Sequence, residues 1–332
     1  MTSIRLRISA AAVLLCGAAA WLSCGRQSPA PRPIRLAIGA QQSPSQLLAY
    51  LAHELDSYRA CGVDVALEEF PGSGKAMEAL LGGSVDVVSG YHEQTMQLPP
   101  GAPALKSFVA MTNGHLVALV VSPRTTGVEH IGQLAGRTIG VTTLGSATHL
   151  WLNFLLSKRN LGRESVTPVA ISTAGRAVAA IERGVVDAGV VSDFTVRTLQ
   201  ARFGNVRILS DSRTPEAARD FYGVDQYPGT ALFARNDWIV AHQDAAKSLV
   251  CAVGRARDWA SKHDAAKVAA RMPASHRGDN AALYTEVIRQ TLRMLTPDGR
   301  ISAEGAEAAR KLSGTARAAA DSYTNEFIDS TR

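Results

Sequence analysis

The chain repeats one pattern of residues at an interval of 101 positions. The paired positions carry the same residue type: Ile38 and Ile139, Gly39 and Gly140, Gly74 and Gly175, Ala76 and Ala177, Ala79 and Ala180, Gly83 and Gly184, Val85 and Val186, and Asp86 and Asp187. Each copy runs from an apolar strand through a loop and a helix to a second short helix, a glycine and a Val-Asp strand. Two such units predict two similar lobes with parallel-sheet character. Because ligands bind at the carboxyl ends of strands in open α/β sheets, two facing lobes would bring both sets of loops into one cleft.

The clearest unit is the stretch Gly136–Leu156. Residues Thr138–Val141 predict a strand, the residues that follow are small and polar, and from Ala147 apolar residues recur at helical spacing. We expect Ser146 or Thr148 to cap this helix by accepting hydrogen bonds from its first N–H groups. The other free N–H groups and the positive end of the helix dipole would favour an anion. The alternative is a plain structural turn, which many α/β proteins contain.

Composition excludes several classes of function. The chain has 332 residues, enough for two domains, and its 46% hydrophobic and 19% charged residues suit a globular protein. The formal net charge of +6 is mild and no basic run is interleaved with aromatic residues, so we do not expect nucleic-acid binding. No GxSxG, HExxH or complete P-loop motif is present, and the eight histidines show no metal-ligand spacing. We therefore expect no enzyme activity, no metal and no cofactor.

The N-terminal segment predicts export. Arg5 and Arg7 precede the apolar residues 8–22, a stretch that suits a signal-peptide core and is short for a membrane span. The residues around Cys24 resemble a bacterial lipoprotein cleavage box. We expect residues 1–23 to be a signal peptide, Cys24 to be lipidated and the proline-rich residues 24–33 to be a tether. The alternative is ordinary signal cleavage without lipidation. Either form of processing places the mature protein in the periplasm or cell envelope.

Two cysteines, Cys61 and Cys251, remain in the body of the mature chain. They lack the spacing of a metal site or a CxxC redox pair. We expect two buried or half-buried thiols. A disulfide between them is the alternative that an oxidising compartment would permit.

The order of predicted elements divides the chain into two lobes. We expect residues 34–122 to form the first part of lobe I, 123–227 to form lobe II, and 228–332 to complete lobe I and add the C-terminal helices. Strands are predicted at 34–39, 63–70, 85–89, 105–111, 116–121, 138–141, 166–171, 185–191 and 206–209, and residues 227–235 are predicted to be the return crossing to lobe I. Helices are predicted at 46–59, 75–81, 147–156, 176–183, 244–263, 265–271, 279–294 and 303–311.

Several segments, in order, resemble the solute-binding proteins of bacterial ABC importers, in particular the nitrate/sulfonate/taurine-like group. The segments are ALLGGSVDV (79–87), LAGRTIGV (134–141), GSATHLWLNFLL (145–156), AIERGVVDAGV (180–190), DGRISAE (298–304) and YTNEF (323–327). The resemblance implies the two-lobe type II periplasmic-binding-protein fold, with two mixed sheets flanked by helices, two hinge crossings and a ligand cleft between the lobes. It also implies a monomer that delivers a small organic anion, such as a sulfonate or carboxylate, to the permease and ATPase subunits of an ABC importer. The alternative on the same fold is a binder or sensor of a pyrimidine-like or vitamin-precursor-like heterocycle, which Tyr91 or Trp151 would stack against.

Carried over position by position, the resemblance implies a binding site made of loops that follow the strands. The implied ligand-binding residues are Gln41, Gln42, Ser43, Ser73, Gly74, Tyr91, His92, Thr143, Gly145, Ser146, Thr148, Ser192 and Asp193.

Several polar residues near these loops have structural alternatives. Gln42 and Ser43 could instead cap a helix, and Tyr91 could pack the cleft floor without touching the ligand. His92 is expected in a loop, whereas His149 and Trp151 are expected in the core or at a lobe interface. Four charged residues near the loops are expected to be structural or to face solvent. Asp86 and Asp187 are expected to be structural residues at strand starts, and Lys75 and Arg176 are expected to face solvent.

Overall fold

The computed structural model describes residues 32–39 and 43–329. The predicted signal peptide, Cys24 and most of the tether lie outside these residues. None of the helices in the described part is both long enough and apolar enough to cross a membrane.

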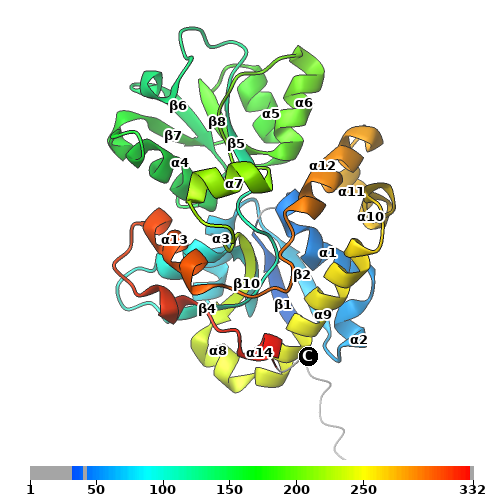
Figure 1. The fold of residues 1–332 in the computed structure, drawn as a ribbon. Coiled ribbons are helices and arrows are strands. Elements are labelled where there is room, and N and C mark those ends of the chain that lie inside the picture. The colour runs from blue at the N-terminus through cyan, green and yellow to red at the C-terminus, as the bar shows by residue number, and fades with distance from the viewer. Residues whose placement is uncertain (1–31, 40–42, 330–332) are drawn as a thin grey trace, which may run out of the picture. The chain divides into compact units, whose positions relative to one another are not determined.

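Two mixed sheets of five strands organise the described chain (Figure 1). The first contains, in spatial order, β2 (Val65–Glu69), β1 (Ile34–Ile38), β3 (Val87–Tyr91), β10 (Thr230–Arg235) and β4 (Leu105–Ala110). The second contains β7 (Thr167–Ala170), β6 (Thr138–Val141), β8 (Ala188–Ser192), β5 (Val117–Val121) and β9 (Ile208–Asp211). The two orders correspond strand for strand, and in each sheet the fourth strand runs antiparallel to the third. The predicted pair of lobes with mixed sheets is confirmed.

Helices cover both sheets. Lobe I carries η1 (Pro44–Gln46), α1 (Leu47–Glu54), α2 (Ser57–Ala60), α3 (Ser73–Leu81), η2 (His92–Met96), α8 (Asn236–Ala241), α9 (Gln243–Ser261), α10 (Ala265–Arg271), α11 (Ala274–Arg277), α12 (Ala281–Arg293), α13 (Ala303–Ser313), η5 (Ala319–Ser322) and α14 (Glu326–Asp329). Lobe II carries η3 (Ile131–Leu134), α4 (Ala147–Ser157), η4 (Arg163–Ser165), α5 (Ala174–Glu182), α6 (Asp193–Phe203) and α7 (Pro215–Tyr222). Five α-helices are absent from the sequence-based prediction: α6, α7, α8, α11 and α14.

The core follows from the alternation of side chains along the strands. Leu36 and Ile38 of β1 face one side and pack with α1 and α9, whereas Ala37 between them faces the other side and packs with α3. In lobe II, Trp151 of α4 is fully buried beside Ile139 of β6. The expected core position of Trp151 is therefore confirmed.

The sequence repeat is also a structural repeat, with one displacement. The bounds of α3 and α5, and those of β3 and β8, differ by the predicted 101 positions. The ladders, however, pair Leu36 with Val87 and Ile139 with Ala188, so the equivalent residues of β1 and β6 lie 103 positions apart. The predicted match of Gly39 with Gly140 is thus wrong by two residues. Because side chains alternate with a period of two, this shift leaves the faces of the strand unchanged and is invisible in the hydrophobic pattern.

Asp86 and Asp187 occupy equivalent structural positions. The Asp86 carboxylate accepts the backbone N–H of Arg35 at 2.9 Å and pairs with its guanidinium at 3.0 Å. The Asp187 carboxylate accepts the backbone N–H of Thr138 at 2.9 Å and pairs with Arg137 at 3.1 Å. Each aspartate therefore ties one strand start to its neighbour, as predicted.

Two chain crossings join the lobes and are bonded to each other. The first crossing (residues 111–116) leads from β4 to β5, and the second (223–229) leads from α7 to β10. The Gly114 N–H donates to the Tyr227 carbonyl, and the Gly229 N–H donates to the Thr112 carbonyl, both at 2.9 Å. A Cβ atom on Gly229 would lie 2.1 Å from the Gly114 carbonyl oxygen, so only glycine permits this approach.

Two predicted boundaries are wrong. The strand β5 belongs to the second sheet, so lobe II begins before Val117 rather than at residue 123. A uniformly buried apolar strand gives no sign in its sequence of which sheet it will join. The predicted helix 46–59 is interrupted after α1, because Asp56 adopts a left-handed conformation with φ of 56° before α2 begins.

The expectation of free thiols is also wrong. Cys61 and Cys251 form a disulfide, with their Cα atoms 6.1 Å apart. The bond joins the end of α2 to α9, and the two cysteines are 190 residues apart in sequence. Their proximity results from the packing of these helices on one sheet face, which no local pattern encodes.

Candidate functional site

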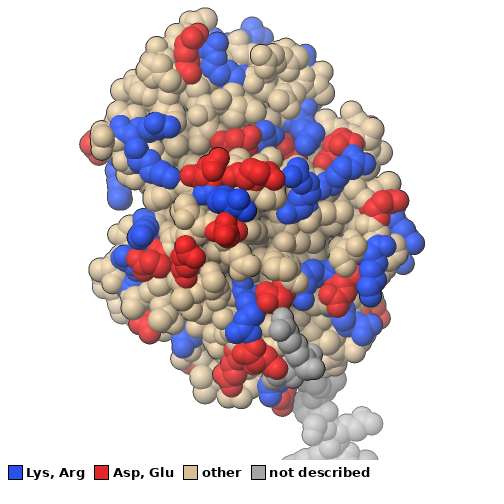
Figure 2. Space-filling view, in the orientation of Figure 1, with Lys and Arg blue, Asp and Glu red and all other residues tan. Residues whose placement is uncertain are grey.

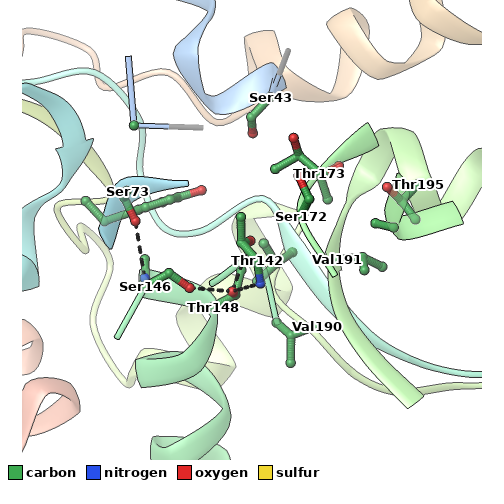
Figure 3. A pocket seen from close by; sticks show the side chains of 16 residues that line it. Ser43, Ser73, Thr142, Ser146, Thr148, Ser172, Thr173, Val190, Val191 and Thr195 are labelled. Atoms are coloured by element: carbon green, nitrogen blue, oxygen red, sulfur yellow. Dashed lines mark hydrogen bonds between the residues drawn. The ribbon is translucent and has the colours of Figure 1, made fainter. Parts of the chain in front are cut away.

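A polar pocket lies where the carboxyl ends of strands from both sheets meet. Tyr91 and Ser192 end β3 and β8, and Gly39 and Thr142 follow β1 and β6. Among the described residues, the lining consists of Gly39, Ser43, Ser73, Tyr91, Val117, Thr142, Ser146, Ala147, Thr148, Ser172, Thr173, Ala177, Val190, Val191, Ser192 and Thr195 (Figure 3). The duplicated strand–loop–helix units therefore converge on one cavity, as the repeat predicts.

Four helices begin at this pocket. Ser73 is the first residue of α3, and Ser146, Thr173 and Ser192 are the N-cap residues of α4, α5 and α6. In none of these helices does the side chain of the N-cap residue accept a hydrogen bond from the N–H groups of the first turn. The chain does use such caps elsewhere, since Asp264 caps α10. The helix starts at the pocket thus keep backbone N–H groups that no N-cap side chain satisfies.

Hydroxyl groups form a small network at the start of α4 (Figure 3). The Thr148 hydroxyl accepts the Thr142 N–H at 2.8 Å, donates to the Thr142 hydroxyl at 3.1 Å and lies 2.9 Å from the Ser146 hydroxyl. The Ser146 hydroxyl accepts the N–H of Thr143 at 3.4 Å. The prediction that Ser146 or Thr148 caps α4 is therefore wrong, because both hydroxyls bond to the preceding loop instead.

One hydrogen bond crosses the cleft at this point. The N–H of Ala147, the first residue of α4, donates to the hydroxyl of Ser73 in lobe I at 3.4 Å. The pocket leaves about 30 Å³ of free space, which is room for only one or two water molecules. An organic ligand therefore needs the two walls to separate, and separation would break the contact between Ser73 and Ala147.

Among the residues that the structure describes, no charged side chain lines the pocket. Asp193, in the first turn of α6, is buried and its two oxygens accept from Arg197 at 2.7 Å and Arg213 at 2.6 Å. Its charge is thus balanced beside the site rather than presented to a ligand. Figure 2 shows acidic and basic side chains interspersed on the face drawn.

Tyr91 and His92 are neighbours with different surroundings. Tyr91 lines the pocket, and burial raises the pKa of its phenol to about 12, so that it carries a proton. One face of its ring stacks on His115, with the ring centres 4.3 Å apart. His92 instead lies between the hydroxyls of Ser107 at 2.9 Å and Ser322 at 3.3 Å, and burial lowers its pKa to about 3.

The structure therefore brings together six of the residues that the sequence predicts for the site: Ser43, Ser73, Tyr91, Ser146, Thr148 and Ser192. Five others do not line the pocket: Gly74, His92, Thr143, Gly145 and Asp193. Gln41 and Gln42 lie outside the described residues.

Glycines near the pocket have structural reasons for their identity. A Cβ atom on Gly74 would lie 3.1 Å from the Thr143 hydroxyl, so Gly74 permits a close approach of the two lobes. Gly145 has a φ of 75°, a conformation that favours glycine, and its N–H donates to His149 at 3.0 Å.

The sequence-based prediction missed lining residues of two kinds. Some follow strands in the same way as the predicted ones: Gly39, Thr142, Ser172 and Thr173. A strict rule that takes the first residues after every predicted strand would have found Thr142, Ser172 and Thr173, whereas Gly39 was predicted as the last residue of its strand. The others are small or branched residues inside elements, whose orientation depends on packing: Val117, Ala147, Ala177, Val190, Val191 and Thr195.

The two sheets, the paired crossings and the pocket at the facing strand ends define a two-lobe periplasmic-binding-protein fold of type II. Residues 43–266 match the family model described as NMT1/THI5 like, and the chain belongs to this family. A comparison with curated protein sequences finds no match.

Solved structures share this fold. A protein of Bordetella bronchiseptica RB50 is 28% identical with a TM-score of 0.84, and the match covers 90% of this chain and 96% of that one. The alkanesulfonate-binding protein SsuA from Xanthomonas axonopodis pv. citri, bound to MOPS, is 22% identical with a TM-score of 0.63, over 85% of this chain and 91% of that one. The desulfurization enzyme DSZB is 16% identical with a TM-score of 0.58, over 90% and 98% of the two chains.

Proposed function

We propose that this protein is the solute-binding component of an ABC importer and that it binds a small organic anion outside the cytoplasm. The observation that carries the proposal is the convergence of four helix starts, none with a capping side chain from its N-cap residue, on one pocket of hydroxyl groups. Backbone N–H groups at helix starts donate to anions, and the helix dipole adds a favourable potential.

The site suits an anion of low charge. Serine and threonine hydroxyls can donate to a ligand oxygen, and these hydrogen bonds strengthen when the closing lobes exclude water. The described part of the lining offers no guanidinium or ammonium group to balance a full second charge. Desolvating a dianion here would cost more than desolvating a monoanion. We therefore propose a monosulfonate or monocarboxylate as the ligand, which is consistent with the sulfonate MOPS bound to SsuA.

Calorimetry against matched ligands tests this proposal. Methanesulfonate, taurine, MOPS and acetate form the set that carries a sulfonate or carboxylate group, with taurine and MOPS also carrying an amine, dimethyl sulfone is a neutral analogue of methanesulfonate, and tetramethylammonium is a cation. We expect at least one anion to bind and neither of the other two compounds to do so. Binding of the cation or the neutral sulfone with no binding of any anion would show that the ligand class is wrong.

We propose binding without catalysis. The fold alone does not decide this point, because the desulfurization enzyme DSZB shares it. Among the described residues, the pocket lining contains no Cys, His, Lys, Asp or Glu that could serve as nucleophile or general acid–base. An anion that binds in the calorimeter should be recovered chemically unchanged after long incubation, as NMR spectra of the mixture would show. A new product that accumulates with time would contradict this part of the proposal.

A heterocyclic ligand finds less support. Trp151 is fully buried and stacks on Phe221, with ring centres 4.6 Å apart, so it does not reach the pocket. Tyr91 has one ring face covered by His115. The described part of the pocket therefore contains no aromatic pair that could sandwich a ring.

We propose that Cys24 anchors the mature protein in the membrane and that permease and ATPase subunits receive its ligand as partners of a monomeric receptor. Mass spectrometry of the N-terminal peptide from the membrane fraction should detect a diacylglyceryl group on Cys24. The variant Cys24→Ser should be released into the soluble fraction. Unmodified Cys24 in an exported soluble protein would instead indicate ordinary signal cleavage.

A further inference from the structure

A buried polar cluster lies where the two crossings pass each other. It consists of Glu93, His115, Tyr222 and Tyr227, and we call it the hinge cluster. Glu93 belongs to η2 of lobe I, Tyr222 ends α7 of lobe II, and His115 and Tyr227 lie in the first and second crossings. Glu93 and His115 are fully buried.

The hydrogen bonds of the cluster link both lobes and both crossings. The two Glu93 oxygens accept from His115 Nε2 at 2.8 Å and from the Tyr227 hydroxyl at 3.2 Å. The Tyr222 hydroxyl lies 2.6 Å from His115 Nδ1 and accepts the His115 backbone N–H at 3.3 Å. Burial raises the pKa values of Tyr222 and Tyr227, so both phenols keep their protons and can donate. Every polar side-chain atom of Glu93 and His115 is therefore satisfied.

The rings of the cluster reach the ligand site. His115 stacks on Tyr91, a residue of the pocket lining, and it contacts the rings of Tyr222 and Tyr227 with centroids 5.7 and 5.6 Å away. Tyr222 and Tyr227 stack on each other at 3.8 Å. A change in the angle between the lobes would move Tyr222 relative to Glu93, and His115 would have to follow together with the ring of Tyr91.

A buried acid beside a buried histidine is a poor way to gain stability. Removing such groups from water costs free energy, and well-packed apolar residues at the same positions are often at least as stable. Directional hydrogen bonds, in contrast, hold partners in one arrangement. This physical argument favours a role in specifying geometry over a role in stability.

We propose that His115 is the positioning residue of the binding site: Glu93 on one lobe and Tyr222 on the other hold it, and it sets the angle between the lobes together with the place of Tyr91. The proposal depends on the two-lobe arrangement and not on the identity of the ligand. It therefore stands or falls separately from the proposed function.

The test measures the distance between the lobes in the ligand-free full-length protein. Spin labels are attached to Val185→Cys in lobe II and Val240→Cys in lobe I, two residues with exposed fractions of 61% and 63%. The background carries Cys16→Ser and Cys24→Ser, so that only the introduced cysteines react while the Cys61–Cys251 disulfide stays intact. Pulsed electron spin resonance then gives the distribution of distances, and thermal unfolding is recorded separately.

The decisive variant is the double substitution Glu93→Gln with His115→Gln, which removes both ionisable groups and keeps hydrogen-bonding side chains. We expect its distance distribution to shift or broaden relative to the parent. The milder variant Tyr222→Phe removes one hydroxyl and keeps the stacked ring, and it decides the matter if the double variant fails to fold. A distribution identical to the parent in the folded variants overturns the proposal.

His92→Gln is the matched control. His92 is a buried histidine next to Glu93 in sequence, but its side chain bonds only within lobe I, to Ser107 and Ser322. We expect this variant to lower the unfolding temperature and to leave the distance distribution unchanged. If His92→Gln moves the distribution as much as the hinge-cluster variants do, the effect is general loosening and the proposal is overturned.

Discussion

Hydroxyl side chains dominate the site at the scale of single residues. Of the 16 lining residues that the structure describes, nine are serine or threonine. A hydroxyl both donates and accepts, so it can bond to its neighbours in one state and turn to a ligand in another. Thr148 is the most connected of them, because its oxygen serves the N–H and the hydroxyl of Thr142 and also lies beside Ser146.

The variant Thr148→Val keeps the shape of this side chain and removes the hydroxyl. It leaves the Thr142 N–H without its partner in a buried place, which should cost about 1–3 kcal/mol of stability. We expect the affinity for the anion identified by calorimetry to fall about tenfold or more, since tenfold corresponds to about 1.4 kcal/mol. Thr148→Ser, which keeps the hydroxyl, is the control. Equal affinity in the valine variant and the parent would show that the start of α4 is not part of the binding surface.

The lowered pKa of His92 predicts that the free energy of unfolding depends on pH. Burial lowers its pKa to about 3 in the folded state, whereas the ordinary value is 6.5. Below pH 6.5 the unfolded chain takes up a proton that the folded chain does not, so the contribution of His92 is complete above pH 6.5 and is lost as the pH falls toward 3. The loss approaches about 1.4 kcal/mol per pH unit.

Urea unfolding of the parent and of His92→Gln between pH 4 and pH 7 measures this contribution. The stability difference between the two proteins should shrink as the pH falls, because glutamine does not titrate. Parallel curves for the two proteins would mean that His92 takes up its proton without unfolding.

At the scale of elements, helix starts and crossings decide the architecture. Both copies of the repeat place a helix start after a strand, and the pocket forms where these starts meet. The crossings hold the copies together through backbone hydrogen bonds between Gly114 and Tyr227 and between Gly229 and Thr112. The close backbone pairing of the two crossings depends on Gly229, because this residue has no side chain.

The variant Gly229→Ala tests that dependence. Its Cβ would lie 2.1 Å from the Gly114 carbonyl oxygen, and backbone atoms on both sides cannot move aside cheaply. We expect a loss of about 3 kcal/mol or more in the free energy of unfolding, at the upper end of overpacking effects. Gly254→Ala, in the middle of α9 where the nearest atom would be 3.8 Å away, is the control and should be neutral or stabilising by up to about 1 kcal/mol. Similar losses in both variants would contradict the steric explanation.

At the scale of the whole molecule, one covalent link spans most of the chain. The Cys61–Cys251 disulfide joins residues 190 positions apart and closes a loop that contains all of lobe II. Such a bond restricts the unfolded chain strongly, because the entropy of loop closure grows with loop length.

Reduction of this disulfide should lower the free energy of unfolding by about 2–5 kcal/mol. Urea unfolding with and without a reductant measures the loss. The double variant Cys61→Ser with Cys251→Ser should show the lower stability from the start and no further response to the reductant. If the parent protein has the same unfolding curve with and without the reductant, the disulfide does not contribute to the free energy of unfolding.

Much of the fold could be predicted from the sequence, because the relevant signals are local. The duplicated strand–loop–helix units, the Val-Asp strands and the glycine stops all appear as periodic patterns, and the structure confirms two lobes with corresponding sheets. Asp86 and Asp187 were correctly interpreted as structural, since a symmetric pair of acids at strand starts fits a backbone role better than a catalytic one.

The misses share one physical origin. The strand β5 joins the second sheet, Asp193 pairs with Arg197 and Arg213, and His92 turns into lobe I. The sheet that a strand joins and the direction in which a side chain points depend on partners that are distant in the chain. These partners determine whether the side chain faces a ligand or the protein interior.

By itself, the sequence determined that the chain makes two similar α/β halves whose strand ends carry small polar loops, since this information lies in residue spacing. Only the tertiary structure decided which polar residues line the pocket, that Cys61 and Cys251 are bonded, and that Glu93 meets His115 between the lobes. The physical reason is that these contacts form between residues far apart in the chain, whose distances are set by the packing of whole helices and sheets.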